Sequence, residues 1–132
     1  MILLDICSGI STVNSSGTII TTPGYSVENY PHNLDCEIGV RFKEGKSIVI
    51  TFIGEFGIEH HGTCIYDYIE IFDDPSYDAP AIDKICGLSN PGIKEINGYF
   101  ARIKFHSDSH VNNKGFSLQL TEKDPQNGKI SF

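Results

Sequence analysis

The stretch Tyr99-Phe-Ala-Arg-Ile-Lys-Phe105 alternates between apolar and charged side chains over its last five residues. In an extended chain, neighbouring side chains point to opposite faces of the sheet. Arg102 and Lys104 therefore share one face, which we expect to point outward. The opposite face carries the side chains predicted to point into the core, namely Ala101, Ile103 and Phe105. This period of two is typical of a β-strand with one buried face.

The same pattern recurs in short runs along the whole chain. Their inward sets are Ile38, Val40 and Phe42; Ile48, Ile50 and Phe52; Ile69 and Ile71; and Phe116, Leu118 and Leu120, with a shorter candidate strand at Thr18–Thr21. Turn-forming residues separate the runs, for example Pro23-Gly24, Ser89-Asn-Pro-Gly92 and Asn97-Gly98. Several short strands at regular spacing predict an all-β fold, a two-sheet antiparallel β-sandwich.

Length and charge narrow the class of protein. The chain has 132 residues, which fits one domain better than two. With 10 Lys and Arg against 17 Asp and Glu, its formal net charge is −7. This balance argues against a nucleic-acid partner, because such a surface needs a basic stripe to displace counterions from phosphates. The sequence also has no apolar run of about 18 residues, so we expect no membrane insertion.

We predict that residues 7–121 form the folded domain. Residues 1–6 are not a signal peptide, because they lack its basic segment and its apolar length. They are interpreted as an N-terminal leader or an artificial start. Residues 122–132 are interpreted as a polar C-terminal tail or linker that contains Pro125 and Gly128. These features suggest a part of a larger secreted or cell-surface protein.

The four cysteines point to an oxidising compartment. They are even in number, lie at positions 7, 36, 64 and 86, and never form a C-x-x-C pair. Such spacing does not fit a zinc ribbon or a thioredoxin motif. We therefore expect two disulfides in an extracellular protein, with four free thiols in a cytosolic protein as the alternative. Four cysteines allow three pairings.

Several spaced motifs resemble the CUB domain. They are Thr22-Pro-Gly-Tyr25 with Tyr30-Pro31, Phe52-Ile-Gly-Glu-Phe-Gly-Ile-Glu59, Cys64-Ile-Tyr-Asp67, Cys86-Gly87, and Phe105-His-Ser-Asp108 with Gly115-Phe116. The resemblance runs from Cys7 to about Leu120. The chain departs from the family pattern at Ile38, where a tryptophan is usual, and in the turns at Tyr25-Ser26 and Asp74-Pro75.

The resemblance implies a jelly-roll-like sandwich with two sequential disulfides, Cys7–Cys36 and Cys64–Cys86. It also implies a calcium site at one end of the sandwich. Three acids match the family's side-chain ligands, namely Glu59, Asp67 and Asp108. Tyr30 matches the tyrosine that orients these acids. The backbone carbonyl of His110 or Val111 matches a further ligand.

Elementary chemistry agrees with a calcium site. Ca²⁺ takes six to eight oxygen ligands, which carboxylates supply well. Glu59 ends one strand run and Asp67 begins the next, so both belong at the same end of a sandwich. Three such carboxylates repel one another, so we expect disorder or partial protonation without the ion. The alternative is that each acid only solvates a loop.

The nearby histidines raise the alternative of a transition-metal site. Imidazole suits zinc or copper better than calcium. His60 and His61 flank Glu59, and His106 and His110 flank Asp108. Adjacent His60 and His61 would point to opposite faces of an extended chain, which favours surface histidines over a shared metal.

The predicted function is calcium-dependent binding of another protein outside the cell. The resemblance implies that calcium-organised acids face a Lys or Arg of the partner, with Glu59, Asp108 and Tyr30 as contact residues. Carbohydrate binding and a structural spacer are the alternatives. We expect no enzyme, because the sequence lacks a nucleophile elbow, an H-E-x-x-H motif and a phosphate loop. It also lacks the tryptophan expected of a glycosidase cleft around a Glu59–Asp67 pair.

One modification motif is present. Asn14-Ser-Ser16 is an N-glycosylation sequon, which is consistent with secretion. An unmodified loop asparagine is the alternative.

Overall fold

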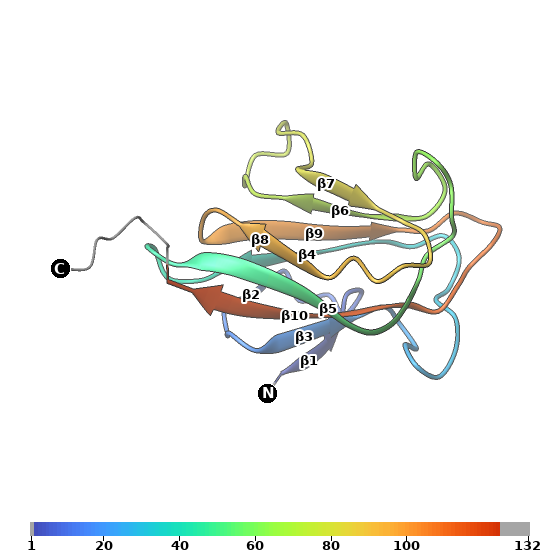
Figure 1. Ribbon diagram of the computed structural model, residues 1–132, viewed down its shortest axis with the longest axis horizontal. Helices are drawn as coiled ribbons and strands as arrows, with labels where there is room; N and C mark the ends of the chain where they lie inside the picture. Colours follow the sequence, from blue (N-terminus) through green and yellow to red (C-terminus); the bar gives the residue numbers. More distant parts are fainter. Residues whose placement is uncertain (1, 125–132) are drawn as a thin grey trace.

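A computed structural model describes residues 2–124, and these residues form two packed β-sheets (Figure 1). The strands are β1 (Leu3–Asp5), β2 (Thr12–Val13), β3 (Thr18–Thr21), β4 (Asp35–Arg41), β5 (Ser47–Gly57), β6 (Tyr68–Phe72), β7 (Asp83–Ile85), β8 (Ile93–Ile96), β9 (Phe100–His106) and β10 (Gly115–Lys123). Within this part of the chain there is no helix that could cross a membrane.

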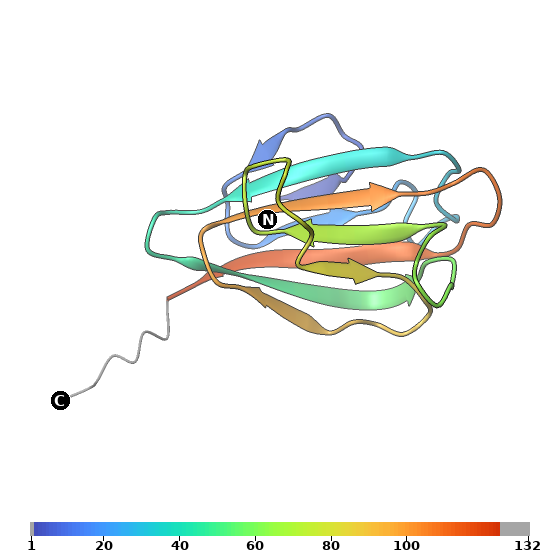
Figure 2. The same ribbon diagram turned by 90° about the horizontal axis from the view of Figure 1, so that it is seen from above.

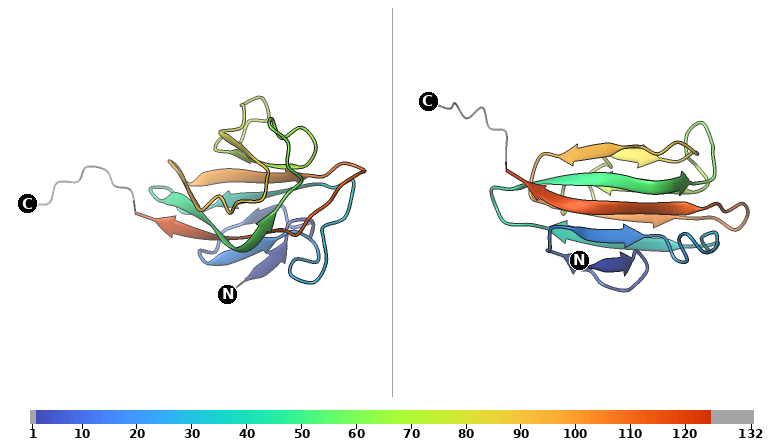
Figure 3. Two further views of the ribbon diagram at one scale, coloured as in Figure 1. Left: turned by 45° about the vertical axis from the view of Figure 1, so that its right-hand side comes forward. Right: turned by 60° about the horizontal axis from the view of Figure 1, so that its bottom comes forward.

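Each sheet has five strands. The first has the order β1-β3-β10-β5-β8, and the second has the order β2-β4-β9-β6-β7. Figures 2 and 3 show the two layers lying face to face along their length. All pairings are antiparallel except the two edge pairs β1·β3 and β2·β4, which are parallel. The predicted all-β sandwich is therefore confirmed, with two parallel edges that the sequence pattern did not reveal.

The core lies between the sheets and is built from the alternating sets. Ile103 of β9 pairs with Ile38 of β4 and Ile71 of β6, and all three side chains are fully buried. Ile38 thus fills, within the core, the position where the family usually has tryptophan. Burial of such aliphatic side chains stabilises the fold by about 1.5–3 kcal/mol each.

The folded unit is longer than the predicted limits of 7–121. β1 pairs with β3, and Ile6, which follows it, is buried. At the other end, β10 continues through Glu122 and Lys123, which pair with Ile48 and Ser47. The predicted leader and tail therefore both contribute residues to the first sheet. Residues 125–132 of the predicted tail lie outside the described residues.

Two disulfides fix loops at one end of the sandwich. Cys7–Cys36 links the turn after β1 to β4, and Cys64–Cys86 links the loop after β5 to the segment after β7. This is the sequential pairing implied by the family resemblance. Each bridge of this kind stabilises the fold by about 3 kcal/mol through the loss of unfolded-chain entropy.

Arg102 is on the outward face of β9, as predicted, but it is not exposed to solvent. Only 5% of its surface is accessible, because residues of the β6–β7 connection lie across it. Its guanidinium lies 4.1 Å from the ring centroid of Phe72 and 4.3 Å from that of Tyr77. It also forms an ion pair of 3.2 Å with Glu37. Arg102 therefore fastens this connection to the outside of the second sheet.

We predict that Arg102→Ala lowers the free energy of unfolding by about 2 kcal/mol, because it removes two cation–π contacts and the ion pair with Glu37, which keeps only its hydrogen bond from Tyr77. Denaturant unfolding monitored by circular dichroism measures the change. Arg102→Lys is the matched control and should lose less, because it keeps the charge but not the planar stacking. Equal stability of wild type and Arg102→Ala would contradict this role.

Candidate metal centre

Ends of strands from both sheets meet at the end of the sandwich where the loops gather on the right of Figure 1. Among them, β5 and β9 finish there, and β4, β6 and β10 begin there. Glu59 lies two residues after β5, Asp67 lies immediately before β6, and Asp108 lies two residues after β9. The antiparallel strand order thus brings together acids that are far apart in the sequence.

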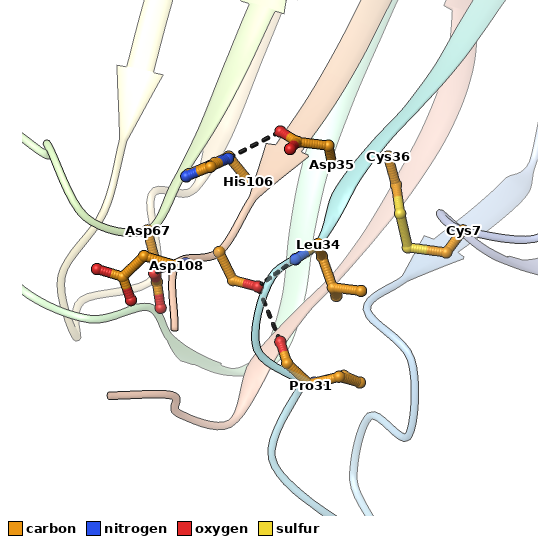
Figure 4. A network of polar contacts seen from close by, with 9 residues as sticks. Cys7, Pro31, Leu34, Asp35, Cys36, Asp67, His106 and Asp108 are labelled. Carbon is orange, nitrogen blue, oxygen red and sulfur yellow. Dashed lines mark hydrogen bonds and ion pairs between the residues drawn. A yellow bond between two sulfur atoms is a disulfide. The ribbon is translucent and has the colours of Figure 1, made fainter. Parts of the chain in front are cut away.

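The three acids form one compact cluster. One carboxylate oxygen from each of Glu59, Asp67 and Asp108 lies within 4.8 Å of the others. Asp67 is fully buried, whereas Glu59 and Asp108 are partly exposed. Figure 4 shows Asp67 and Asp108 side by side beyond the end of β9. The predicted set of acidic ligands is therefore assembled at a single place.

Tyr30 contacts the cluster from the side of the core. Its hydroxyl donates a hydrogen bond of 2.7 Å to Asp67 Oδ2 and accepts one of 3.1 Å from the backbone N–H of Glu59. Its ring packs edge-on against Phe105 at a centroid distance of 5.0 Å. Burial, followed by the hydrogen bond to Asp67, raises the pKa of the Tyr30 hydroxyl far above its ordinary value, so it remains a donor.

Tyr30 does not fit the predicted contact with a partner. Its side chain has no accessible surface, and its hydroxyl is already used twice within the domain. In the structure its hydroxyl contacts Asp67 and the backbone of Glu59, and orientation of calcium ligands by Tyr30 stays a prediction.

Asp67 is hydrogen-bonded through both carboxylate oxygens. Besides the bond from Tyr30 to Oδ2, the backbone N–H of Asp108 donates to Oδ1 at 2.8 Å. Each oxygen retains a further lone pair, since a carboxylate offers about four acceptor sites. The core and the loop after β9 thus fix Asp67 without using all the acceptor sites of its carboxylate.

The cluster concentrates negative charge, and no Lys or Arg in the described part of the chain pairs with it. Burial raises the pKa of Asp67. Burial, then repulsion from Asp108 and Asp67, raises the pKa of Glu59. Both shifts mean that the ionised cluster is destabilised until a positive charge arrives.

The atoms of the cluster suit a hard divalent cation. Glu59 Oε1 is buried and has no hydrogen-bond partner in the described part of the chain. Such an atom costs roughly 1–3 kcal/mol unless something satisfies it. An all-oxygen donor set matches Ca²⁺ rather than zinc or copper. The donor set of Glu59, Asp67 and Asp108 is therefore of the kind that calcium prefers, and ligation by these residues stays a prediction.

The loop after β9 wraps around Asp108. The backbone N–H of His110 donates to Asp108 Oδ1 at 3.1 Å. His110 also lies close enough to Glu59 to favour its charged form and to lower its pKa, against the larger effect of burial. Ligation by the carbonyl of His110 or Val111 stays a prediction.

The histidines do not join the acids. Among residues 2–124, the three acids are the only set of three or more His, Cys, Asp or Glu side chains with ligand atoms this close. His61 instead accepts a hydrogen bond from the backbone N–H of Thr63 and packs against Tyr66. His106 stacks on Tyr68 and lies 2.8 Å from Asp35.

Two supporting residues escaped the sequence prediction. Asn112 Nδ2 donates to the carbonyl oxygen of Tyr30 at 2.9 Å. Ser107 Oγ donates to the carbonyl of Pro31 at 2.8 Å and accepts from the backbone N–H of Leu34 at 2.9 Å, bonds that Figure 4 shows joining two loops. Their sequence signal was weak, because Asn112 lies in an ordinary turn motif and Ser107 between two charged or titratable residues.

The sequence profile of the CUB domain matches residues 7–120. The chain belongs to the CUB domain family. The match covers every strand from β2 to β9 and most of β10, together with all three acids and both disulfides. The family resemblance seen in the sequence is confirmed.

Relatives of this CUB domain are parts of much longer proteins. Rat cubilin is 42% identical over 113 residues, which are 85% of this chain and 3% of cubilin. Mouse neuropilin-2 is 33% identical over 121 residues, which are 85% of this chain and 13% of neuropilin-2. The chain therefore spans only a small share of these relatives.

A solved structure adds an observation on the metal. The crystal structure of the MASP-1 CUB2 domain bound to Ca²⁺ is 29% identical, with a TM-score of 0.74. The match covers 87% of this chain and 99% of that domain. A CUB domain of similar fold thus binds calcium.

We predict that, in the presence of EDTA, the stability of this CUB domain falls as the pH rises above about 4, the region of the carboxyl pKa values in the unfolded chain. The folded pKa values of Asp67 and Glu59 are raised, so the folded state holds protons that the unfolded state has already lost. The stabilisation from these retained protons is fully present below the pKa values of the unfolded chain. It is lost as the pH rises through the higher pKa values of the folded state.

Denaturant unfolding of wild type and Asp67→Asn at a series of pH values tests this prediction. The variant removes the buried charge and relieves the repulsion on Glu59, so its stability should fall less across the same range. Other carboxyl groups affect both proteins equally and cancel in the difference. Parallel pH curves for the two proteins would show that the cluster is not destabilised by its own charge.

Proposed function

We propose that this CUB domain binds Ca²⁺ through Glu59, Asp67 and Asp108 and, in that state, binds a partner protein outside the cell through a Lys or Arg of the partner. The observation that carries the proposal is the cluster of three carboxylates, which pair with no Lys or Arg of residues 2–124, with Glu59 Oε1 buried and unsatisfied. The calcium-bound MASP-1 domain supports the choice of ion.

Calcium would supply the positive charge that the cluster lacks. Neutralisation would remove the repulsion between Glu59 and its neighbours and hold the loops after β5 and β9 against each other. Backbone carbonyls of His110 or Val111 would complete the ligand set with water, since Ca²⁺ takes six to eight oxygens. Affinities of extracellular calcium modules lie at about 0.1–1 mM.

The partner's basic residue would approach the exposed side of the cluster. Asp67 is buried, so Glu59 and Asp108, which are partly exposed, are the acids that can face outward. A carboxylate that binds calcium through one lone pair can accept a charge-assisted hydrogen bond through another. The net charge of −7 also favours a basic partner surface.

Exposed apolar side chains close to the acids support a protein partner. Ile65 and Tyr66 directly precede Asp67, and Val111 lies three residues after Asp108. Their exposed fractions are 55%, 40% and 55%. Apolar side chains around a polar centre are typical of protein interfaces. The proposed role is binding rather than catalysis, because buried Asp67 is hydrogen-bonded on both oxygens and has no access to a substrate.

We predict that calcium at ten times its dissociation constant stabilises wild type by about 1.4 kcal/mol, whereas Asp67→Asn and Asp108→Ala lose this effect. Isothermal calorimetry and thermal unfolding, each with calcium and with EDTA, measure it. Glu55→Gln is the matched control, since it removes an exposed acid at the same end of the sandwich but outside the cluster. Equal calcium responses in wild type and Asp108→Ala would refute the proposed site.

The same proteins test the basic partner. N-acetyl-lysine amide, titrated and followed by NMR, should shift the amide signals of Glu59 and Asp108 only when calcium is present. If the amide signals of the calcium-loaded wild type do not shift with this probe, the lysine contact is refuted, and the proposal of calcium binding is unaffected.

We predict that Tyr30→Phe weakens calcium binding about 10-fold, in line with the loss of a residue that orients a metal ligand. The variant keeps the ring contact with Phe105 but removes the hydrogen bonds to Asp67 and from Glu59. Calorimetry gives the affinity, and circular dichroism in EDTA checks that the sandwich is intact. An unchanged affinity would mean that the other contacts of Asp67 alone fix its carboxylate.

A further inference from the structure

Asn14 lies at the surface, immediately after β2. Its side chain is exposed and makes no hydrogen bond within residues 2–124. It begins the only N-x-Ser/Thr sequon in the 132-residue sequence, Asn14-Ser-Ser16. An amide group that is neither buried nor used by the fold is free for chemistry.

The rest of the sequon forms a tight turn that keeps Asn14 at the surface. The carbonyl oxygen of Ser15 accepts hydrogen bonds from the backbone N–H of Thr18 at 3.3 Å and from its hydroxyl at 2.6 Å. Gly17 has a φ of 97°, a conformation that glycine adopts without strain. Ser16 Oγ accepts a hydrogen bond of 2.9 Å from the backbone N–H of Glu122. The turn is thus fixed independently of the Asn14 side chain.

An open hollow of about 410 Å³ lies beside Asn14, a volume within the range of small-molecule sites. It is lined by Thr12, Asn14, Arg41, Phe42 and Lys43. Arg41 is held on the rim, with its guanidinium 5.1 Å from the ring centroid of Phe100. The lining combines hydroxyl and cationic donors with apolar stems, a mixture that suits the polar edge and the apolar face of a sugar.

We propose that Asn14 carries an N-linked glycan whose first sugar, an N-acetylhexosamine, lies in this hollow. In the transfer step, Nδ2 of Asn14 attacks the anomeric carbon of a lipid-diphosphate oligosaccharide, the donor of the secretory pathway, under a membrane transferase. The C1–Nδ2 bond forms, the C1–oxygen bond to the diphosphate breaks, and Nδ2 loses one proton. The lipid diphosphate leaves with the bonding electron pair, and nothing is oxidised or reduced.

The position of the glycan leaves the acidic cluster free. Arg41 ends β4, whereas Asp35 at the start of the same strand lies at the end of the sandwich that holds the acids. The sugar would instead cover β2, a two-residue edge strand that pairs only with β4. Exposed sheet edges are sites of aggregation, and natural proteins often protect them by covering them. This inference does not depend on calcium binding.

Secretion from a eukaryotic cell line, followed by intact-mass and peptide mass spectrometry, tests the modification. Wild type should carry a hexosamine-based glycan on Asn14, which peptide N-glycosidase removes, leaving an aspartate in its place. Asn14→Gln should lack the glycan. Ser15→Ala is the matched control, since it changes the neighbouring residue but keeps the sequon, and it should remain glycosylated. Secreted wild type with an unmodified Asn14 would overturn the proposal.

Amide hydrogen exchange tests the place of the first sugar. In the glycosylated protein, the amides of 12–13 and 41–43 should exchange several-fold more slowly than after enzymatic removal of the glycan. The amides around Asp67 and Asp108 should exchange at the same rate in both forms. Equal exchange at 12–13 and 41–43 would show that the glycan extends into solvent and would overturn its assignment to the hollow.

Discussion

The hydrogen bond from the Tyr30 hydroxyl to Asp67 joins the core of this CUB domain to its acidic end. The Tyr30 ring belongs to the core through its contact with Phe105, which in turn packs against Phe116. The hydroxyl reaches Asp67 and the backbone of Glu59. This contact fixes the Asp67 carboxyl at a fully buried position that water does not reach.

The other two acids are held less firmly than Asp67. Asp67 directly precedes β6 and receives two donors, whereas Glu59 and Asp108 lie on loops and remain partly exposed. The disulfide Cys64–Cys86 limits the freedom of the loop that carries Glu59. The site is therefore organised in part by the fold itself, and the loops supply the part that a cation would order. An ion present at ten times its dissociation constant would add only about 1.4 kcal/mol, so it would order the loops without deciding whether the chain folds.

The sequence predicted the sandwich because it depends on a local pattern, and it predicted the acids through the motifs that resemble the CUB family. The period of two along Ala101, Ile103 and Phe105 marks an inward face wherever the strand lies, and the three acids lie at strand ends. Contacts between distant segments were beyond such patterns. The burial of Arg102 depends on its contact with Tyr77. The parallel pairing of β1 with β3 could not be predicted, because a three-residue strand is too short to show a pattern. Burial of Tyr30, which excludes its predicted partner contact, likewise follows from packing.

The two ends of the sandwich carry different chemistry, and the packed strands between them keep these ends apart. The end with Glu59 and Asp108 presents unbalanced negative charge and exposed apolar side chains, whereas the end with Asn14 presents Arg41 and Lys43 around an uncharged amide. β4 connects the two ends through a fully buried centre at Ile38 and Val40. A close-packed centre of this kind keeps the distance between the ends fixed. A modification at one end and a ligand at the other can therefore act on the same small domain without competing for surface.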